Sequence, residues 1–310
     1  MLEVVELSKH YKKTKAVDNI NMYLEKGETV GLLGPNGAGK STAISMISSL
    51  IAPTHGDVRL FNQSILKKPG ELRSRLGVVP QEIALYNDLS AKENLEFFGR
   101  IHRLSGSQLK KKTEEILHQI GLEDRKKDLV KHFSGGMKRR LNIGVALLHD
   151  PELIIMDEPT VGIDPQSRNH ILETVKRLNE ERDMTILYTS HYMEEVEYLC
   201  NRIYIMDKGN IIASGTKDEI KKILSAENTI EIKLEKMNKA LISRLREDPS
   251  VAHITFEDKS ITIVVPREVN LFHKIFQYAE ETDAKPLSVE IKTPSLEDVF
   301  LHLTGRALRD

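Results

Sequence analysis

The sequence has no tryptophan, and aromatic residues make up only 5% of its 310 positions. Few aromatic rings argue against a surface that stacks nucleic-acid bases. There is one cysteine, Cys200, which cannot form an internal disulfide and suits a reducing compartment. Long apolar runs are missing too: Leu153–Met156 and its neighbours are among the longest, whereas a membrane helix needs about 20 apolar residues.

Charge of one sign is not in excess either. The 45 lysines and arginines face 46 acidic residues, which favours neither nucleic-acid binding nor attraction to an anionic membrane. The N-terminus, MLEVVELSKH, does not read as a basic segment followed by the apolar stretch of a secretory signal. We therefore expect a soluble intracellular protein that binds no nucleic acid and reaches any membrane through a partner.

The length corresponds to about two domains. The first two-thirds of the chain alternates strand-like and helix-like segments. Leu153–Met156 and Thr185–Tyr188 are continuous apolar runs typical of strands covered on both faces, and Gln166–Glu181 between them has one apolar helical face. This alternation predicts an α/β fold with a largely parallel sheet. The other expected strands are Leu2–Leu7, Ile20–Leu24, Glu28–Leu33, Asp57–Phe61, Leu76–Pro80, Arg202–Met206 and Asn210–Ser214.

The pattern changes near residue 225. Alternating apolar residues such as Ile230, Ile232 and Leu234, followed by helical and further strand-like segments, give the order β-α-β-β-α-β. That order predicts a small α+β domain of the ferredoxin-like kind. We expect one domain over residues 1–225 and an accessory domain over 226–310, which in the simplest interpretation carries no chemistry.

A glycine-rich loop follows the strand that ends at Leu33 and opens the helical segment from Ala43. Its glycines allow the backbone to wrap around a phosphate, and the helix N-terminus favours an anion there. Lys40 can reach the β- and γ-phosphates, and the Ser41 hydroxyl can bind Mg²⁺. A glycine-rich turn that binds nothing would not need Lys-Ser after its last glycine. The expected nucleotide-binding residues are Gly34, Pro35, Asn36, Gly37, Ala38, Gly39, Lys40, Ser41 and Thr42.

Two adjacent acids, Asp157 and Glu158, end the apolar strand Leu153–Met156. Ligands of open α/β sheets bind at the C-terminal edge of the strands, which places these acids beside the glycine-rich loop. Successive strand side chains point in opposite directions, so the two acids have different roles. We assign Asp157 to the Mg²⁺ shell and Glu158 to the attacking water as general base. The alternative is a solvated acidic strand end.

A second candidate anion site is Ser134-Gly135-Gly136, which precedes a helical run containing Leu141, Val145 and Leu148. Exposed N–H groups at a helix start attract anions. A Ser-Gly-Gly sequence is equally common as a helix cap or a flexible turn, so these residues alone leave both interpretations open.

Taken together, GPNGAGKST, FSGGM and LIIMDEPT, in this order and spacing, resemble the nucleotide-binding subunit of an ATP-binding-cassette (ABC) transporter over residues 1–225. The resemblance implies a P-loop NTPase cassette with a parallel core sheet, an antiparallel side sheet and a helical subdomain. It also implies ATP as the bound nucleotide, Mg²⁺ as its cofactor and ATP hydrolysis as the activity.

Four further residues take roles only from this resemblance. Tyr11 matches the aromatic residue that stacks on adenine, and Gln81 matches the glutamine that links Mg²⁺ and the attacking water to the membrane partner. Asp164 matches the aspartate of the loop that crosses the dimer interface, and His191 matches the histidine that contacts the γ-phosphate. Without the resemblance, Tyr11 and His191 would be interpreted as surface residues. The implied catalytic set is Glu158, His191, Gln81 and Lys40, and the implied metal set is Ser41, Gln81 and Asp157.

The sequence also departs from the common family pattern. Phe133 and Met137 replace Leu and Gln of the signature LSGGQ, which removes one polar contact but no phosphate-contacting Ser or Gly. The SGGM-KRR signature, together with a C-terminal segment ending in LEDVFLHLTG, resembles the ABC-2-type exporter ATPases that serve drug, antibiotic, polyketide or sodium-extrusion permeases.

The resemblance implies two kinds of partner. In the family, Ser134, Gly135 and Gly136 cover the γ-phosphate held by the opposite subunit, so we expect a head-to-tail homodimer or equivalent cassette dimer. We also expect Ile83–Phe98 to dock an integral-membrane permease, which would hold the chain at the cytoplasmic face of the cell membrane. Two alternatives stay open here: a soluble ABC ATPase acting on nucleic acid or ribosomes, and a module that senses ATP without hydrolysing it.

Overall fold

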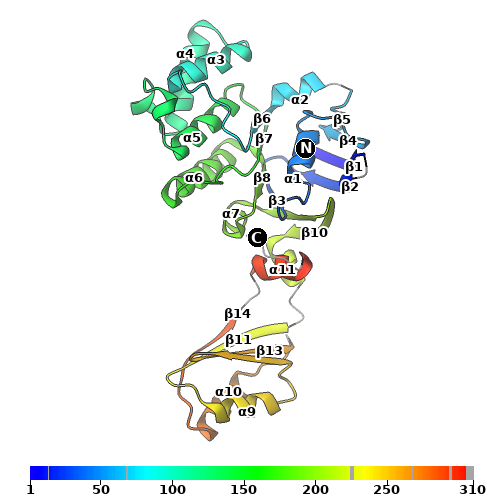
Figure 1. Cartoon of the computed structure of the whole chain (residues 1–310), viewed down its shortest axis with the longest axis vertical. Helices are drawn as coiled ribbons and strands as arrows, with labels where there is room; N and C mark the ends of the chain where they lie inside the picture. Colours follow the sequence, from blue (N-terminus) through cyan, green and yellow to red (C-terminus); the bar gives the residue numbers. More distant parts are fainter. Residues whose placement is uncertain (13, 68, 224–226, 267, 293–294, 305–310) are drawn as a thin grey trace. The chain divides into compact units, whose positions relative to one another are not determined.

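The computed structural model describes residues 1–304 apart from 13, 68, 224–226, 267 and 293–294 (Figure 1). The chain divides into a first unit, Met1–Lys217, and a second unit that begins at Asp218. The domain boundary expected after residue 225 falls outside the described residues. Each unit has its own hydrophobic core and is considered by itself.

The first unit is built on a six-stranded sheet in which all strands except β10 run parallel. Its middle strands are fully buried, since β3, β7 and β8 expose no residue to solvent. Apolar runs covered on both faces are the signature of parallel sheets, so the sequence prediction is confirmed. In spatial order the strands are β10 (Asn210–Thr216), β9 (Arg202–Asp207), β3 (Thr29–Leu33), β8 (Thr185–Ser190), β7 (Leu153–Met156) and β6 (Leu76–Val79).

An antiparallel four-stranded sheet lies beside it. The order is β2 (Thr14–Leu24), β1 (Leu2–Tyr11), β4 (His55–Leu60) and β5 (Gln63–Ser64). One hydrophobic cluster joins the two sheets through the helix α1 (Lys40–Ile47), with Leu7, Ile44 and Leu32 among its members. The pairing of β1 with β2 is interrupted by shifts of register. These bulges break the alternation of apolar residues, which explains why the sequence predicted only the second half of β2.

Helices cover the rest of the first unit. Figure 1 shows α3, α4 and α5 grouped on the β6 side of the central sheet. A capping box at Ser90 and Glu93 begins α3, because each residue satisfies a backbone N–H of the other. The remaining elements are α2 (Pro69–Arg75), α3 (Ala91–Ile101), α4 (Gly106–Gln119), the short 3₁₀ turns Glu123–Arg125 and Val130–His132, α5 (Gly135–Ala146), α6 (Pro165–Arg182) and α7 (Met193–Leu199).

One charged segment behaves differently from the expectation for charge runs. The run Lys110–Lys112 on α4 is interpreted from the sequence as a solvated face. Lys112 is instead buried, with its Nζ 2.5 Å from Asp150 Oδ1 and 3.3 Å from Glu115 Oε1. A lysine is buried when a carboxylate neutralises it, and Asp150 lies 38 residues away in sequence, so local pattern could not reveal the pair.

The second unit has the predicted β-α-β-β-α-β order. Its antiparallel sheet runs β12-β13-β11-β14, which is the ferredoxin-like arrangement, and α9 and α10 cover one face of it (Figure 1). The core contains Ile230 and Ile232 of β11, Leu241 of α9 and Ile275 of α10. The elements are α8 (Lys217–Lys222), β11 (Glu227–Leu234), α9 (Lys239–Glu247), β12 (His253–Glu257), β13 (Ser260–Pro266), α10 (Phe272–Glu281), β14 (Pro286–Lys292) and α11 (Leu296–Thr304).

The predicted fold class is confirmed. The chain combines a parallel core sheet, an antiparallel side sheet and a helical group with a small α+β unit. Within the described part of the chain, none of the helices has both the length and the apolar character needed to cross a bilayer.

Candidate active site

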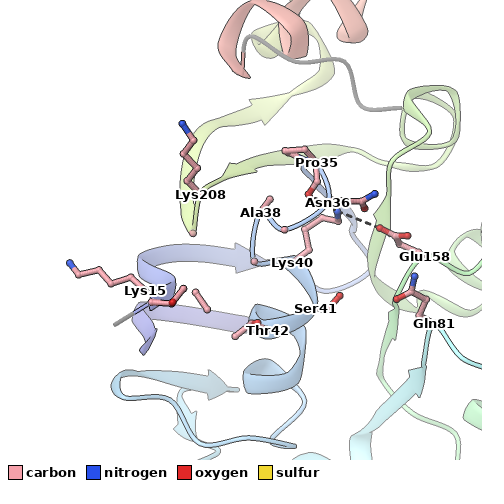
Figure 2. Close-up of a pocket in the computed structure, with 15 residues that line it drawn as sticks. Lys15, Pro35, Asn36, Ala38, Lys40, Ser41, Thr42, Gln81, Glu158 and Lys208 are labelled. Carbon is pink, nitrogen blue, oxygen red and sulfur yellow. Dashed lines mark hydrogen bonds and ion pairs between the residues drawn. The ribbon is translucent and has the colours of Figure 1, made fainter. Parts of the chain in front are cut away.

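A cavity of about 470 Å³ opens at the C-terminal edge of the central sheet, where β3 leads into α1. Figure 2 shows the glycine-rich loop along one wall, with Gln81 and Glu158 on the side of β6 and β7. The cavity is lined by Thr14, Lys15, Ala16, Pro35, Asn36, Gly37, Ala38, Gly39, Lys40, Ser41, Thr42, Gln81, Glu158, Lys208 and Gly209. Residues from five separate segments of the sequence therefore converge on one space.

The loop that joins β3 to α1 owes its shape to glycine. Gly39 caps α1 with a φ of 106°, a backbone conformation that other residues rarely adopt. A Cβ atom at this position would lie 2.4 Å from the carbonyl oxygen of Ala16, so the approach of β2 also requires glycine. The helix start that follows points its free N–H groups toward the cavity, which is the usual geometry of a phosphate site.

Lys40 is buried at the floor of this loop. Its Nζ donates hydrogen bonds to the carbonyl oxygens of Gly34, at 2.7 Å, and Pro35, at 3.3 Å. The same Nζ lies 3.4 Å from Oε1 of the buried Glu158, and the dashed line in Figure 2 marks this ion pair. The cation is thus fixed where it can exchange its carboxylate partner for a phosphate oxygen.

The two acids are held by a residue that the sequence did not single out, Thr189 of β8. Its Oγ1 donates to Asp157 Oδ1 at 2.8 Å, and it accepts a hydrogen bond from the backbone N–H of Glu158 at 2.8 Å. Glu158 itself has a φ of 45°, which is uncommon for a residue other than glycine. Such a conformation persists only where the surroundings enforce it, and Thr189 supplies that support.

Asp157 lies behind the cavity wall, buried next to Glu158. Burial raises the pKa of its carboxyl group, and the negative charge of Glu158 raises it further, against the opposing effect of the hydrogen bonds from Thr189 and Ser41. The carboxylate is therefore incompletely compensated by the groups around it.

His191 contacts the carboxylate of Glu158, at the oxygen that does not pair with Lys40. Its Nδ1 lies 3.3 Å from Glu158 Oε2, and its ring packs against Tyr192 with centroids 4.3 Å apart. Glu158 is thus placed between Lys40 and His191. The structure brings Lys40, Glu158 and His191 together. From the sequence, only the family resemblance placed His191 at this site.

Gln81 follows β6, and its backbone is tethered to the helix α5. Arg139 is buried and donates from its two terminal nitrogens to the carbonyl oxygens of Pro80 and Gln81, each at 2.7 Å. This role of Arg139 was not predicted from the sequence. In the sequence Arg139 is simply an arginine close to Ser134. Because 58 residues separate it from Gln81, local patterns do not reveal the contact.

Three predicted residues, Ser134, Gly135 and Gly136, lie at the start of α5 and are not among the described residues that line the cavity. Ser134 and Gly135 are exposed, and Ser134 caps the helix by accepting from the N–H of Met137 at 3.2 Å. A Cβ atom at Gly136 would lie 2.3 Å from Ser167 Oγ, so glycine allows α5 to pack against the start of α6.

Asp164 caps α6 and is also outside the cavity lining as far as the chain is described. Its Oδ1 accepts from the N–H of Ser167 at 2.9 Å, and the hydrogen bonds with Ser167 lower the pKa of the carboxyl group. The Asp164 turn and the Ser134 turn therefore adjoin one another on a surface separate from the cavity.

Tyr11 stands at the end of β1 with 48% of its surface exposed and the ammonium of Lys9 5.4 Å from its ring centroid. It does not belong to the set of described residues lining the cavity. Lys15 and Lys208, which the sequence analysis did not name, line it instead, and Figure 2 shows both on the side away from Glu158. Two lysines there would favour an anionic ligand.

The donor set fits a nucleotide with Mg²⁺. The Ser41 hydroxyl lies near enough to the Asp157 carboxylate to lower its pKa, and both groups are hard oxygen ligands of the kind that Mg²⁺ prefers. Among the described residues, no group of three His, Cys, Asp or Glu side chains is arranged to hold a metal by itself. Mg²⁺ usually completes its shell with water and phosphate oxygens, so a metal here would arrive with the nucleotide.

Comparison with known families gives two matches. Residues 17–161 match the family described as ABC transporter, and residues 215–304 match the C-terminal domain of DrrA1-3-like ATP-binding proteins. The first match contains the glycine-rich loop, the Ser134 turn and both acids.

Similar proteins and structures agree with these matches. The linearmycin resistance ATP-binding protein LnrL of Bacillus subtilis (strain 168) is 47% identical over 312 residues and covers 100% of both chains. The Nod factor export ATP-binding protein I of Paraburkholderia xenovorans (strain LB400) is 36% identical, covering 100% of this chain and 98% of its own. A dimeric post-hydrolysis structure of the ATP-binding cassette MJ0796, bound to ADP and Pi, has a TM-score of 0.64 at 29% identity. That likeness covers 70% of this chain and 98% of the other.

Proposed function

The chain belongs to the ATP-binding cassettes of the ABC transporter family, and from this we propose how its residues divide the work of an exporter ATPase. As an ATPase it binds and hydrolyses ATP. We propose that two cassettes pair head to tail around two ATP molecules and that this pairing drives a separate permease in the membrane.

One observation supports the pairing above all others. The cavity contains the glycine-rich loop and Glu158, while the exposed Ser134 and Gly135 begin a different helix and do not line it within the described part of the chain. An anion site that is exposed and unused in its own subunit suits the nucleotide of a second copy. In such a two-fold interface each subunit gives the same surface that it receives.

Within each site the roles follow from the contacts. Lys40 would bind the β- and γ-phosphates, and Glu158 would accept a proton from the attacking water. The water oxygen forms a bond to the γ-phosphorus as the bond to the β-phosphate oxygen breaks, which gives ADP and phosphate. His191, next to Glu158, would contact the γ-phosphate, and Tyr11 would have to approach the adenine from outside the present cavity lining.

Mg²⁺ bound with the nucleotide would supply positive charge to the phosphate oxygens. Ser41, Asp157 and Gln81 are the residues that would hold it. The raised pKa of Asp157 supports this assignment, because burial has left that carboxylate in need of a cation.

The Glu158→Gln substitution tests the proposal. The amide cannot accept the proton, so we expect hydrolysis to fall by about 100-fold or more while ATP is retained. Size-exclusion chromatography should then show an ATP-dependent dimer. In the matched control, Glu158→Gln combined with Ser134→Arg, a bulky cation at the exposed turn should prevent dimerisation without loss of ATP binding. Unchanged hydrolysis by Glu158→Gln, or a monomer with ATP bound, would refute the proposal.

We also propose that part of Ile83–Phe98 docks the permease. Ala91 and Leu95 bury one face of α3, whereas Tyr86 remains 50% exposed. The rings of Tyr86 and Phe97 pack edge to face with centroids 4.8 Å apart, and both side chains are accessible. An exposed aromatic cluster of this kind marks an interaction surface.

Substituting Tyr86 and Phe97 by serine should reduce recovery of the chain with native membranes by about tenfold, as expected for aromatic anchors. ATP hydrolysis by the purified chain should persist. Ile101→Ser is the control, because Ile101 is exposed at the end of the same helix beyond the proposed surface. Equal membrane recovery of both variants would contradict this docking site.

The proposals for export and for location rest on the similar proteins. One relative is named for linearmycin resistance and another for Nod factor export, and the second unit matches a DrrA-like domain. We propose that this chain likewise serves an exporter and works at the cytoplasmic face of the membrane, held there by the permease. Which compound is moved would be decided by that separate permease chain.

A further inference from the structure

A third buried carboxylate, Glu195 of α7, lies close to Asp157 and Glu158 in the fold but does not line the cavity within the described residues. Only 1% of its surface is exposed. Three hydroxyl groups donate to it: Thr160 to Oε1 at 2.7 Å, and Tyr188 and Ser190 to Oε2 at 2.9 and 2.7 Å. The Nε of Arg168 lies 3.6 Å from Oε1.

The donors come from the segments that carry the chemistry. Thr160 belongs to the turn between Glu158 and Asp164, and Ser190 directly precedes His191. Arg168 is in the first turns of α6, which Asp164 caps. One carboxylate therefore accepts hydrogen bonds from the segment holding the proposed base and from the segment holding the proposed γ-phosphate contact. It also forms an ion pair with the helix behind the interface turn.

Successive side chains at the end of β8 bind carboxylates on opposite sides of the strand. Thr189 points to Asp157 and Glu158, whereas its neighbours Tyr188 and Ser190 point to Glu195 on the opposite side. This follows from the alternation of side chains along a strand. Burial raises the pKa of Tyr188 well above its usual value, so its hydroxyl remains a donor to Glu195.

We propose that Glu195 is a positioning residue for ATP hydrolysis, which fixes His191 and the Glu158–Asp164 turn relative to each other. The inference rests on the proposed catalytic roles of Glu158 and His191. Glu195 acts through Thr160 and Ser190, because neither of its oxygens faces the nucleotide cavity. Displacement of a catalytic group by about 1 Å can cost up to about 100-fold in rate, so a rigid link between these segments has a measurable consequence.

Single hydroxyl deletions test this without removing the buried charge. Thr160→Val keeps the shape of the side chain and removes the hydroxyl that donates to Glu195 Oε1. Ser190→Ala removes the hydroxyl that donates to Glu195 Oε2. We expect kcat for ATP hydrolysis by the full chain to fall by about fivefold to tenfold in each, with KM for ATP changed by less than about twofold. Thr160→Ser restores the hydroxyl and should restore kcat.

Thr174→Val is the matched control. Thr174 is also buried, but its hydroxyl donates at 2.8 Å to the carbonyl of His170 within α6. It should lose as much thermal stability as Thr160→Val while keeping the wild-type kcat. Wild-type kcat in Thr160→Val and Ser190→Ala, or an equal loss of kcat in Thr174→Val, would overturn the inference. Either result leaves the proposed function standing, whereas absence of hydrolysis by the wild-type chain would refute that function instead.

Discussion

Two buried aspartates, one in each unit, have surroundings that shift their pKa values in opposite directions. Asp157 in the first unit is 9% exposed, and burial beside Glu158 raises its pKa. Asp248 in the second unit is 4% exposed. Burial would raise its pKa too, but the hydrogen bonds that it accepts outweigh this effect and hold the pKa well below the usual value.

The difference lies in the donors. Asp248 accepts from Lys274 Nζ, from the Tyr278 hydroxyl and from the N–H of Ser250, each at 2.8 Å. Asp157 accepts from neutral hydroxyls and faces another acid. An acid whose task is structural has its charge neutralised within the fold. An acid whose charge remains uncompensated is in the state expected of a ligand site, which gains its counter-charge on binding.

The largest expected effect is in the second unit. Asp248→Asn removes the charge that compensates Lys274 and weakens three hydrogen bonds. A domain of this size melts about 4–8 °C lower for each kcal/mol lost, so we expect its melting temperature to fall by about 5 °C or more. The amide hydrogen-exchange rates of β11 and α10 in the full chain would measure the corresponding loss of stability. Glu281→Gln is the control, because its ion pair with Arg244 is exposed.

The pH dependence has a defined sign. Because the pKa of Asp248 is depressed in the fold, its contribution to stability is present above pH 3.8 and is lost as the pH falls below that value. The wild-type second unit should therefore show an acid-induced loss of protection that Asp248→Asn no longer shows. If both chains lose protection in parallel, the hydrogen bonds to Asp248 do not have the proposed role.

A smaller effect of opposite sign is expected for Asp157→Asn. The amide oxygen can still accept from Thr189, while the repulsion from Glu158 disappears. Without nucleotide, the first unit should melt about 2–4 °C higher, which corresponds to about 1 kcal/mol for a domain of this size. The additional stabilisation by ATP with Mg²⁺ should be lost. A lower melting temperature of the nucleotide-free variant, measured by calorimetry, would end the contrast with Asp248.

Sequence patterns predicted the parts of this protein that depend on neighbouring residues. β7 has the expected bounds, Leu153–Met156, and α6 (Pro165–Arg182) extends the expected Gln166–Glu181 by one residue at each end. The ferredoxin-like order followed from strict alternation of apolar residues. These elements were predictable because a strand or helix buries one face at a fixed period.

Contacts between distant segments were not predictable in this way. Thr189 reaches the Glu158 backbone across 31 residues, and Glu195 reaches Thr160 across 35. Both are ordinary residues of a buried strand or helix when considered locally, and the folding of β8 against β7 brings them to Glu158 and Thr160. The functional motifs were visible in the sequence, but the groups that orient them were not.

The smallest expected effect concerns another long-range pair. His102 caps the C-terminal end of α3, and its ring stacks on His149 with centroids 4.1 Å apart and planes at 6°. Partial burial lowers the pKa of both rings, and the charge of His149 lowers that of His102 further. The hydrogen bond between His149 and the carbonyl oxygen of Leu76 opposes this shift for His149, and the neighbouring Asp150 opposes it to a smaller extent.

Both histidines are therefore favoured in the neutral form, like Asp157 and unlike Asp248. Their contribution to stability is present above pH 6.5 and is lost as the pH falls through the lowered pKa values. His102→Gln should flatten the dependence of the first unit's melting temperature on pH between 6.5 and about 5, whereas His132→Gln, outside the stacked pair, should not. If His102→Gln keeps the same slope as the wild-type chain, the stacked pair does not titrate with folding.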